Sequence, residues 1–420
     1  MDRFVIEGGK KLNGVVEISG AKNSALPIIA ASLLADKKVI IENVPDVVDV
    51  HTMIELIEYI GSTVQFRKNV LEIHTSKIKR VVAPYNIVRK MRASYYVLGA
   101  LIAREKRAKV SLPGGCAIGP RPVDLHIKGL KALGCDIEID RGYIDAICKN
   151  LQGSEINLQG AKGTSVGATI NIMLAATGAQ GTTRINFAAC EPEVVDVANF
   201  LKQLGVNIKG AGTSQITLRG NWCPTEIHYR IIPDRIETGT FVVASAITGG
   251  NVTIKNCHPE HLVAIIDKIK EVGADIHLKE NEIVVKHKKP ILPTDIFVAP
   301  YPGFPTDMQA QFMALLALAS GTSTIKETIF ENRFMQAVEL TRMGANITLE
   351  GDTAVIKGVK NLTGTFVMAS DLRASACLVL AGLTAKGKTC IRRIYHLDRG
   401  YERLERKLKL LGARIRREKE

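Results

Sequence analysis

The sequence predicts an α/β fold of two similar lobes, each built from three repeats. A glycine that precedes a small, a polar and a β-branched residue recurs at Gly61, Gly134, Gly205, Gly273, Gly344 and Gly412. The intervals of 73, 71, 68, 71 and 68 residues give six copies of one repeat in 420 residues. Because three copies make a domain of normal size, at about 210 residues, two lobes are favoured over a single ring, and the repeat is long for a solenoid.

Each repeat is expected to contain an inner helix, a strand, an outer helix and a further strand. Segments such as 24–34, 88–103 and 308–318 are apolar on nearly all sides, which indicates buried inner helices. The outer helices are amphipathic, with apolar residues at i, i+3, i+4 and i+7, as over 48–60, 259–272 and 401–411. The recurring glycine suits a left-handed position after the outer helix. The alternating residues that follow suit a strand.

The composition limits the protein classes that fit. Hydrophobic residues make up 46% and charged residues 23%, which excludes disorder, collagen and coiled coil. No apolar run approaches the roughly 18 to 20 residues that a membrane span needs. The start of the chain lacks the apolar region of a secretion signal, so a cytoplasmic protein is expected. The eight cysteines are scattered without CxxC spacing, which predicts reduced thiols.

The formal net charge of +14 implies an acidic partner. Nucleic acid, a membrane surface and a small phosphorylated or carboxylated molecule all fit this charge. Nucleic-acid binders often interleave basic residues with aromatic ones that stack on bases. Only 5% of this chain is aromatic, which favours a small anion.

Two local patterns are misleading. Residues 382–389 match the phosphate-binding pattern GxxxxGK[ST], but such a loop must follow a strand and open a helix. Here the segment follows a predicted helix and precedes a predicted strand, so an ATPase is rejected. Cys257, His258 and His261 have no further ligand at metal-binding spacing, so no metal site is predicted.

Cys116 lies in a loop rich in glycine and proline, just before a helix that Pro122 can open. Arg121 and the helix N-terminus would lower the thiol pKa toward neutrality. A group with such a pKa works well as a proton donor or nucleophile. An incidental loop cysteine explains these local facts about equally well.

Cationic and polar residues recur at the starts of other predicted helices. Lys22 lies at the start of an inner helix, where an anion is favoured. Similar starts occur at 165–168, 305–308 and 369–373. Arg92, Arg333 and Arg399 would add positive charge to these helix starts. Each arginine alone is weak evidence of a site. Together, the helix starts and the arginines could form a site for a ligand with several anionic groups.

These segments together resemble the enolpyruvyl transferase family, and within it the UDP-N-acetylglucosamine 1-carboxyvinyltransferases. The resemblance runs from Phe4 to the C-terminus. The cysteine loop is its most specific motif. The matching segments include GAKNSALP at 20–27, MRASYYVLG at 91–99, GGCAIGPRPVDLHIKGL at 114–130, SVGATINIMLAA at 165–176, PTDMQAQFMALL at 305–316, ENRFM at 331–335, ASDLRASACLVLAGL at 369–383 and YHLDRGYERL at 395–404.

The resemblance implies transfer of the enolpyruvyl group of phosphoenolpyruvate to the 3′-hydroxyl of UDP-N-acetylglucosamine, with release of phosphate. This is the first committed step of bacterial peptidoglycan synthesis and the target of fosfomycin. The family fold is an inside-out α/β barrel of two lobes joined by a double crossover, here expected at 22–231 and at 1–21 plus 232–420. The implied partners are the two small substrates, without nucleic acid, membrane insertion, metal or organic cofactor.

The resemblance also assigns roles to residues. Cys116 matches the proton donor and Asp307 the carboxylate that takes the hydroxyl proton. Lys22, Arg121 and Arg399 match the cations around phosphoenolpyruvate, and Asn23 orients the same region. Arg333, Asp371 and Arg373 match supporting polar groups. The positions that match nucleotide-sugar contacts are Arg92, Arg121, Pro122, Val123, Asp124, Leu125, Ser165, Val166, Gly167 and Ile329.

One segment departs from the family pattern, and two other functions compete. Lys162 is one residue further from Ser165 than the usual Lys-x-Ser-Val-Gly spacing, so its contact with the diphosphate is not carried over. The sister shikimate-phosphate enolpyruvyl transferase shares the repeat but lacks the Gly-Gly-Cys loop. An RNA-binding or RNA-end-processing protein on related repeats would fit the charge, but not the scarcity of aromatic residues.

Overall fold

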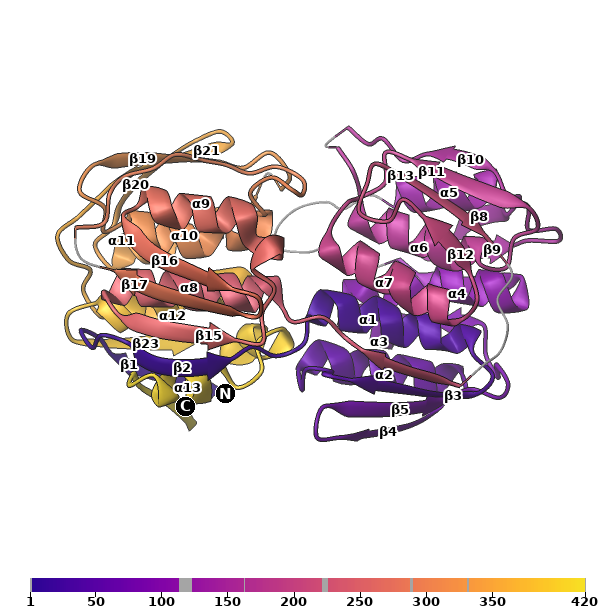
Figure 1. Cartoon of the computed structure of the whole chain (residues 1–420), viewed down its shortest axis with the longest axis horizontal. Coiled ribbons are helices and arrows are strands. Elements are labelled where there is room, and N and C mark those ends of the chain that lie inside the picture. The colour runs from indigo at the N-terminus through magenta and orange to yellow at the C-terminus, as the bar shows by residue number, and fades with distance from the viewer. Residues whose placement is uncertain are drawn as a thin grey trace. The chain divides into compact units, whose positions relative to one another are not determined.

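The computed structural model describes residues 2–112, 123–161, 163–220, 226–287, 290–330 and 332–419. These residues form two compact units. The described residues between 20 and 232 make one unit, and residues 2–19 with those from 233 to 419 make the other. Within the described chain the polypeptide therefore changes unit after Ser19 and again after Ile232 (Figure 1).

Each unit contains three four-stranded sheets, counted over the described residues, and all six follow one pattern. The first strand pairs parallel with the second, and the other neighbours are antiparallel. The sheets of the unit from Gly20 to Ile232 are β14 (Ile227–Arg230)–β3 (Lys38–Glu42)–β5 (Val70–His74)–β4 (Thr63–Arg67), β6 (Val82–Ala83)–β7 (Arg107–Ser111)–β9 (Tyr143–Ile147)–β8 (Asp136–Asp140) and β10 (Glu155–Asn157)–β11 (Thr182–Asn186)–β13 (Gln215–Arg219)–β12 (Asn207–Lys209). Those of the other unit are β2 (Asn13–Glu17)–β15 (Asn251–Lys255)–β17 (Glu282–His287)–β16 (Ala274–Lys279), β18 (Ile296–Phe297)–β19 (Thr322–Lys326)–β21 (Thr353–Lys357)–β20 (Asn346–Glu350) and β22 (Phe366–Met368)–β23 (Lys388–Arg392)–β1 (Asp2–Glu7)–β24 (Arg414–Lys419).

In each unit, strands that are distant in sequence pair with one another and complete the set of sheets. In the unit from Gly20 to Ile232, the last strand, β14, pairs with the first, β3. In the other unit β2, the second strand of the chain, pairs with β15, and the first strand, β1, lies between β23 and β24. Each unit is thus a closed set of three α/β repeats, which confirms the predicted fold class.

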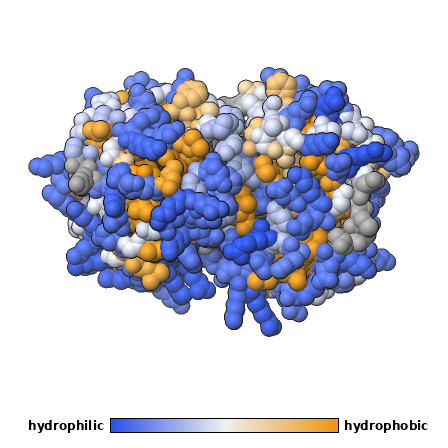
Figure 2. Space-filling model, in the orientation of Figure 1, coloured by the Kyte–Doolittle hydropathy of each residue, from blue (hydrophilic) through white to orange (hydrophobic). Residues whose placement is uncertain are grey.

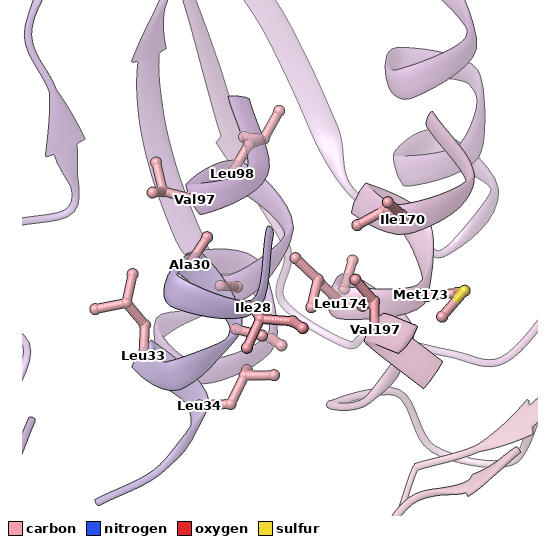
Figure 3. Close-up of a cluster of buried hydrophobic side chains, with 14 of the residues drawn as sticks. Ile28, Ala30, Leu33, Leu34, Val97, Leu98, Ile170, Met173, Leu174 and Val197 are labelled. Atoms are coloured by element: carbon pink, nitrogen blue, oxygen red, sulfur yellow. The ribbon is translucent and has the colours of Figure 1, made fainter. Parts of the chain in front are cut away.

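Six inner helices fill the described interiors, and six outer helices follow the second strand of each repeat (Figure 1). Every residue of α10 is buried, as are nine residues of α6. In Figure 3, Ile28, Leu98 and Leu174 from three inner helices belong to one apolar cluster. The inner helices are α1 (Lys22–Ala31), α4 (Tyr96–Glu105), α6 (Val166–Ala176), α8 (Arg235–Thr248), α10 (Gln309–Leu316) and α12 (Leu372–Thr384). The outer helices are α2 (Val48–Ile60), α5 (Asp124–Ala132), α7 (Pro192–Gln203), α9 (Val263–Glu271), α11 (Met335–Arg342) and α13 (Leu404–Leu410). Short helical turns complete the set: η1 (Ser32–Leu34), α3 (Tyr85–Val88), η2 (Arg92–Tyr95), η3 (Pro259–Leu262), η4 (Thr306–Met308) and η5 (Ile394–Arg399).

The six recurring glycines all end outer helices with positive φ, between 86° and 140°. At Gly412 the backbone N–H donates to the Lys409 carbonyl, and the next N–H donates to that of Leu408. These bonds satisfy carbonyls that a helix end leaves open, in a conformation that costs glycine least. The repeat signal in the sequence is therefore this helix-ending glycine.

The structure corrects the helix expected over 88–103 and tests the segment 382–389. The helix expected over 88–103 is interrupted, because Met91 is extended with φ −149° and ψ 117°, and Arg92 begins a separate turn. The segment matching a phosphate-binding loop lies at the end of α12 and the start of β23, where no helix follows it. The predicted order around this segment, a helix before it and a strand after it, is confirmed.

The surface seen in Figure 2 is dominated by hydrophilic residues, with apolar residues in separate patches. In the described part of the chain, the helices are too short or too polar to cross a membrane.

Candidate active site

Asp307 lies between two arginines in the unit that contains residues 233–419. Its two carboxylate oxygens accept hydrogen bonds from Arg333 Nη2 at 2.6 Å and from Arg373 Nη2 at 2.7 Å. The arginine side chains are 6% and 5% exposed, whereas that of Asp307 is 26% exposed. Two buried guanidinium groups therefore hold a carboxylate that is itself partly accessible to solvent.

Local structure fixes both ends of this cluster. Asp307 is in η4, just before the buried inner helix α10. Asp371 caps α12 by accepting from the backbone N–H groups of Arg373 and Ala374, at 2.8 and 3.0 Å, which places Arg373 in the first turn. The Arg373 guanidinium also lies 5.5 Å from the centre of the Tyr401 ring. Asp307, Arg333, Asp371 and Arg373, all predicted from the sequence, are brought together.

The two arginines determine the charge of Asp307. Burial alone would raise the pKa of this carboxyl, but Arg373 and Arg333 outweigh burial and hold the pKa well below its usual value. Burial would likewise lower the pKa of Arg373, and Asp307 reverses this so that the pKa is raised. Asp307 is consequently an ionised hydrogen-bond acceptor at neutral pH.

Lys22 begins α1 in the other unit and contacts a buried aspartate. Its Nζ lies 3.1 Å from Asp49 Oδ2, and the two side chains are 12% and 3% exposed. A buried carboxylate in hydrogen-bond contact with the ammonium group orients it. Asn23 is the next residue of α1 and is partly buried.

A second cluster in this unit contains Arg92, His126 and the start of α6. The Gly99 N–H donates to Asn171 Oδ1 at 2.7 Å, so the amide nitrogen of Asn171 faces His126 Nδ1 at 3.0 Å. Because an amide nitrogen only donates, Nδ1 must accept, and the proton of the neutral ring is on Nε2. Burial, followed by the Arg92 charge, lowers the pKa of His126 to about 4, so the ring is neutral at pH 7.

The Nε2–H of His126 lies near the first turn of α6. A Cβ atom added to Gly167 would lie 3.4 Å from Nε2. Ser165 caps α6 by accepting from the Ala168 N–H at 3.2 Å. The predicted residues Val166 and Gly167 thus lie at a helix N-terminus beside a neutral donor, where an anion is favoured.

The remaining predicted residues have separate positions. Val123 precedes α5, and Asp124 and Leu125 form its first turn. Arg399 ends η5. The Ile329 N–H donates to Glu327 Oε1 at 2.9 Å. Cys116, Arg121, Pro122 and Lys162 lie outside the described residues.

Sequence reasoning assigned no role to the partners that hold the predicted residues, namely Asp49, His126, Thr306 and Glu327. Asp49 gave a weak signal, because an acidic residue recurs in the first turn of outer helices, as at Asp124 and Glu193. His126 lies within a quoted motif but carries no spacing that sets it apart. Across the described ranges, no three His, Cys, Asp or Glu side chains are placed to hold a metal ion.

Known proteins resemble this chain over its whole length. The family model described as EPSP synthase (3-phosphoshikimate 1-carboxyvinyltransferase) matches residues 6–408. The UDP-N-acetylglucosamine 1-carboxyvinyltransferase of Desulfosudis oleivorans is 52% identical over 417 residues, 99% of each chain. UDP-N-acetylglucosamine 1-carboxyvinyltransferase 1 of Caldanaerobacter subterraneus is 54% identical over 415 residues, again 99% of each.

Solved structures agree on the fold. The enolpyruvyl transferase NikO from Streptomyces tendae matches with a TM-score of 0.90 at 26% identity, over 99% of this chain and 98% of its own. An EPSP synthase from Acinetobacter baumannii matches with a TM-score of 0.75 at 18% identity, over 100% of both chains, and shares the fold.

Proposed function

This chain belongs to the UDP-N-acetylglucosamine 1-carboxyvinyltransferases, and from that premise we propose that it transfers the enolpyruvyl group of phosphoenolpyruvate to the 3′-hydroxyl of UDP-N-acetylglucosamine. The observation that carries the proposal is identity of 50% to 54% over 99% to 100% of the chain to relatives of that name. The transfer releases phosphate and supplies peptidoglycan synthesis. We place it in the cytoplasm, with small molecules as its only substrates and no part for nucleic acid.

The reaction is an addition followed by an elimination. The sugar hydroxyl oxygen bonds to C2 of phosphoenolpyruvate while a proton from Cys116 bonds to C3, and the hydroxyl proton leaves. The tetrahedral phosphate ketal then loses a proton from the new methyl group and breaks its C2–O bond to phosphate. The double bond is restored, and the products are the enolpyruvyl ether and inorganic phosphate.

Asp307 fits the role of acceptor for the hydroxyl proton. Both carboxylate oxygens already accept from arginine, but each keeps a second lone pair. The lowered pKa makes the carboxylate a weak base toward a free alcohol. The hydroxyl becomes far more acidic once its oxygen bonds to C2, so proton transfer accompanies bond formation. The arginine pair therefore fixes the direction of the acceptor.

The cations are assigned to the anionic substrates. Lys22, Arg121 and Arg399 would hold the phosphate and carboxylate of phosphoenolpyruvate, where fixed positive charge stabilises the developing anion. Arg92, Ser165 and the first turn of α6 would hold the nucleotide sugar. We also propose that the enzyme has two domains, at 22–231 and at 1–21 plus 232–420, joined by a double crossover. The two compact units support this division, with changes of unit at 19–20 and 232–233 in the described chain.

The acceptor substrate tests this function against its sister activity. The purified chain should convert phosphoenolpyruvate and UDP-N-acetylglucosamine to the enolpyruvyl nucleotide sugar, detected by mass spectrometry. With 3-phosphoshikimate as acceptor, no enolpyruvyl product should form. The reverse preference would assign the chain to the shikimate branch that the family model describes.

Covalent labelling with an anionic epoxide such as fosfomycin should modify one residue, Cys116. Burial raises the pKa of Cys135, Cys257 and Cys377, which are therefore protonated and inaccessible at neutral pH. Intact-mass analysis should show a single adduct, and peptide mapping should place it at Cys116 with loss of activity. An adduct at another cysteine, or one that leaves turnover unchanged, would contradict the assignment.

A further inference from the structure

Glu327 is a buried carboxylate that the proposed reaction does not use. It follows β19 and is 2% exposed. Its Oε1 accepts from the backbone N–H groups of Ile329 and Phe330, at 2.9 and 3.1 Å. Its Oε2 accepts from Thr306 Oγ1 at 2.7 Å. Glu327 thus ties the loop after β19 to η4, which carries Asp307.

Thr306 passes this restraint to Arg333. Arg333 Nη1 donates to Thr306 Oγ1 at 2.9 Å, and Nη2 of the same group donates to Asp307 Oδ1. Since a guanidinium only donates, Thr306 Oγ1 accepts this bond and its own proton is directed to Glu327. The direction of each hydrogen bond in the series Asp307–Arg333–Thr306–Glu327 is thereby defined.

Arg333 also contacts the loop after β19, which contains Phe330. Its Nε is buried and has no hydrogen-bond partner among the described residues. Its guanidinium lies 5.4 Å from the centre of the Phe330 ring, and the Phe330 N–H is one of the two that Glu327 holds. Glu327 therefore holds Arg333 from two directions, through the Thr306 hydroxyl and through the loop.

We propose that Glu327 is a positioning residue that fixes Arg333 through Thr306 and so orients the Asp307 carboxylate, while the same side chain holds the Ile329 loop. The inference rests on the proposed function, in which Asp307 accepts the hydroxyl proton and Ile329 contacts the nucleotide sugar. One carboxylate then couples the placement of the acceptor substrate to the direction of its proton acceptor.

Substitutions at Thr306 separate the two roles. Thr306→Val removes the hydroxyl and retains the branched shape, so only the path to Arg333 is broken. We expect kcat to fall between tenfold and about 10²-fold, because small misplacements of reacting groups have effects of that order. KM for UDP-N-acetylglucosamine should stay within about twofold, since the Ile329 loop keeps its bonds. Thr306→Ser restores the oxygen and should restore kcat.

Glu327→Gln leaves one side-chain oxygen for two sets of donors, the backbone N–H groups of the loop and the Thr306 hydroxyl. The kcat should therefore fall while KM for the nucleotide sugar rises.

Thr328→Val is the matched control for Thr306→Val. Thr328 lies on the same loop, and its hydroxyl donates to the Val298 carbonyl at 2.8 Å, outside the path to Arg333. Both valine variants lose a hydrogen-bonded hydroxyl, so both should lose thermal stability. Thr328→Val should nevertheless keep the wild-type kcat and KM.

Two readouts distinguish positioning from support of the fold. In Thr306→Val the acid limb of the kcat profile should move to higher pH, because a displaced Arg333 stabilises ionised Asp307 less. A crystal structure of this variant should show the Arg333 guanidinium displaced from Asp307. An unmoved pair, or equal kcat in Thr306→Val and Thr328→Val, would overturn the proposal. Absence of product with wild-type enzyme would instead refute the proposed function, and the crystal structure would still test the positioning.

Discussion

Replacing Cys116 by alanine is expected to lower kcat by about 10²- to 10⁴-fold, the usual contribution of a general acid. The substitution removes the thiol that we propose as the proton donor to C3 of phosphoenolpyruvate, and it changes little volume. Affinity for UDP-N-acetylglucosamine should be nearly unchanged, because none of the nucleotide contacts is removed. Steady-state phosphate release and calorimetric titration of the nucleotide sugar measure the two effects.

Two further variants sharpen this test. Cys116→Asp should retain activity, since a carboxylic acid can also donate the proton, but its optimum should lie at lower pH, where that acid is protonated. Cys190→Ala is a matched control at a partly buried thiol that contacts the Ala188 carbonyl. Its turnover should equal that of the wild type. Near-wild-type kcat for Cys116→Ala at neutral pH would refute the role of the thiol.

The second large effect is expected at Asp307. Asp307→Asn keeps the size of the side chain but removes the carboxylate that both buried guanidinium groups, those of Arg333 and Arg373, contact directly. The free energy of unfolding should fall by about 3 kcal/mol, as when one partner of a buried ion pair is removed. The kcat should fall by about 10²- to 10⁴-fold, because the hydroxyl proton loses its acceptor. Denaturant titration and phosphate release measure these losses.

Asp145→Asn provides the comparison for Asp307. Asp145 also lies near two cations, at 3.5 Å from Arg107 and 3.7 Å from Lys109, but those cations are 54% and 35% exposed. Solvent screens such pairs, so its stability loss should be below about 1 kcal/mol. Its kcat should be unchanged. Equal losses in the two variants would contradict a special environment at Asp307.

The pKa of Asp307 also constrains the pH profile. Because the folded-state pKa lies below the unfolded value, the stabilisation is fully present above the unfolded pKa and is lost only as pH falls through the folded pKa. Between pH 5 and 8 its charge is therefore constant. In the wild type, any change in turnover across that range should therefore come from groups other than Asp307.

The repeat could be predicted from sequence because one local requirement recurs. A helix that ends on a left-handed residue favours glycine, and Gly61 to Gly412 report it six times. The partners of Asp307 have no such local signal. Arg333 and Arg373 are 26 and 66 residues away in sequence, and only the packing of η4, α11 and α12 brings them to one carboxylate.

The tautomer of His126 and the role of Glu327 were equally hidden. His126 depends on Asn171, which in turn is oriented by the Gly99 N–H of another inner helix. Glu327 acts through a threonine hydroxyl whose proton direction follows from a third residue. Such chains of donors and acceptors arise from tertiary contacts, so residue type and spacing cannot reveal them.

Phosphate release from phosphoenolpyruvate, measured with and without UDP-N-acetylglucosamine, tests the central claim most directly. The ketal can form only when the sugar hydroxyl attacks C2, so release should require both substrates and should yield one phosphate per enolpyruvyl nucleotide sugar. Release at the same rate without the nucleotide sugar, or none with both substrates present, would contradict the assignment as an enolpyruvyl transferase acting on UDP-N-acetylglucosamine.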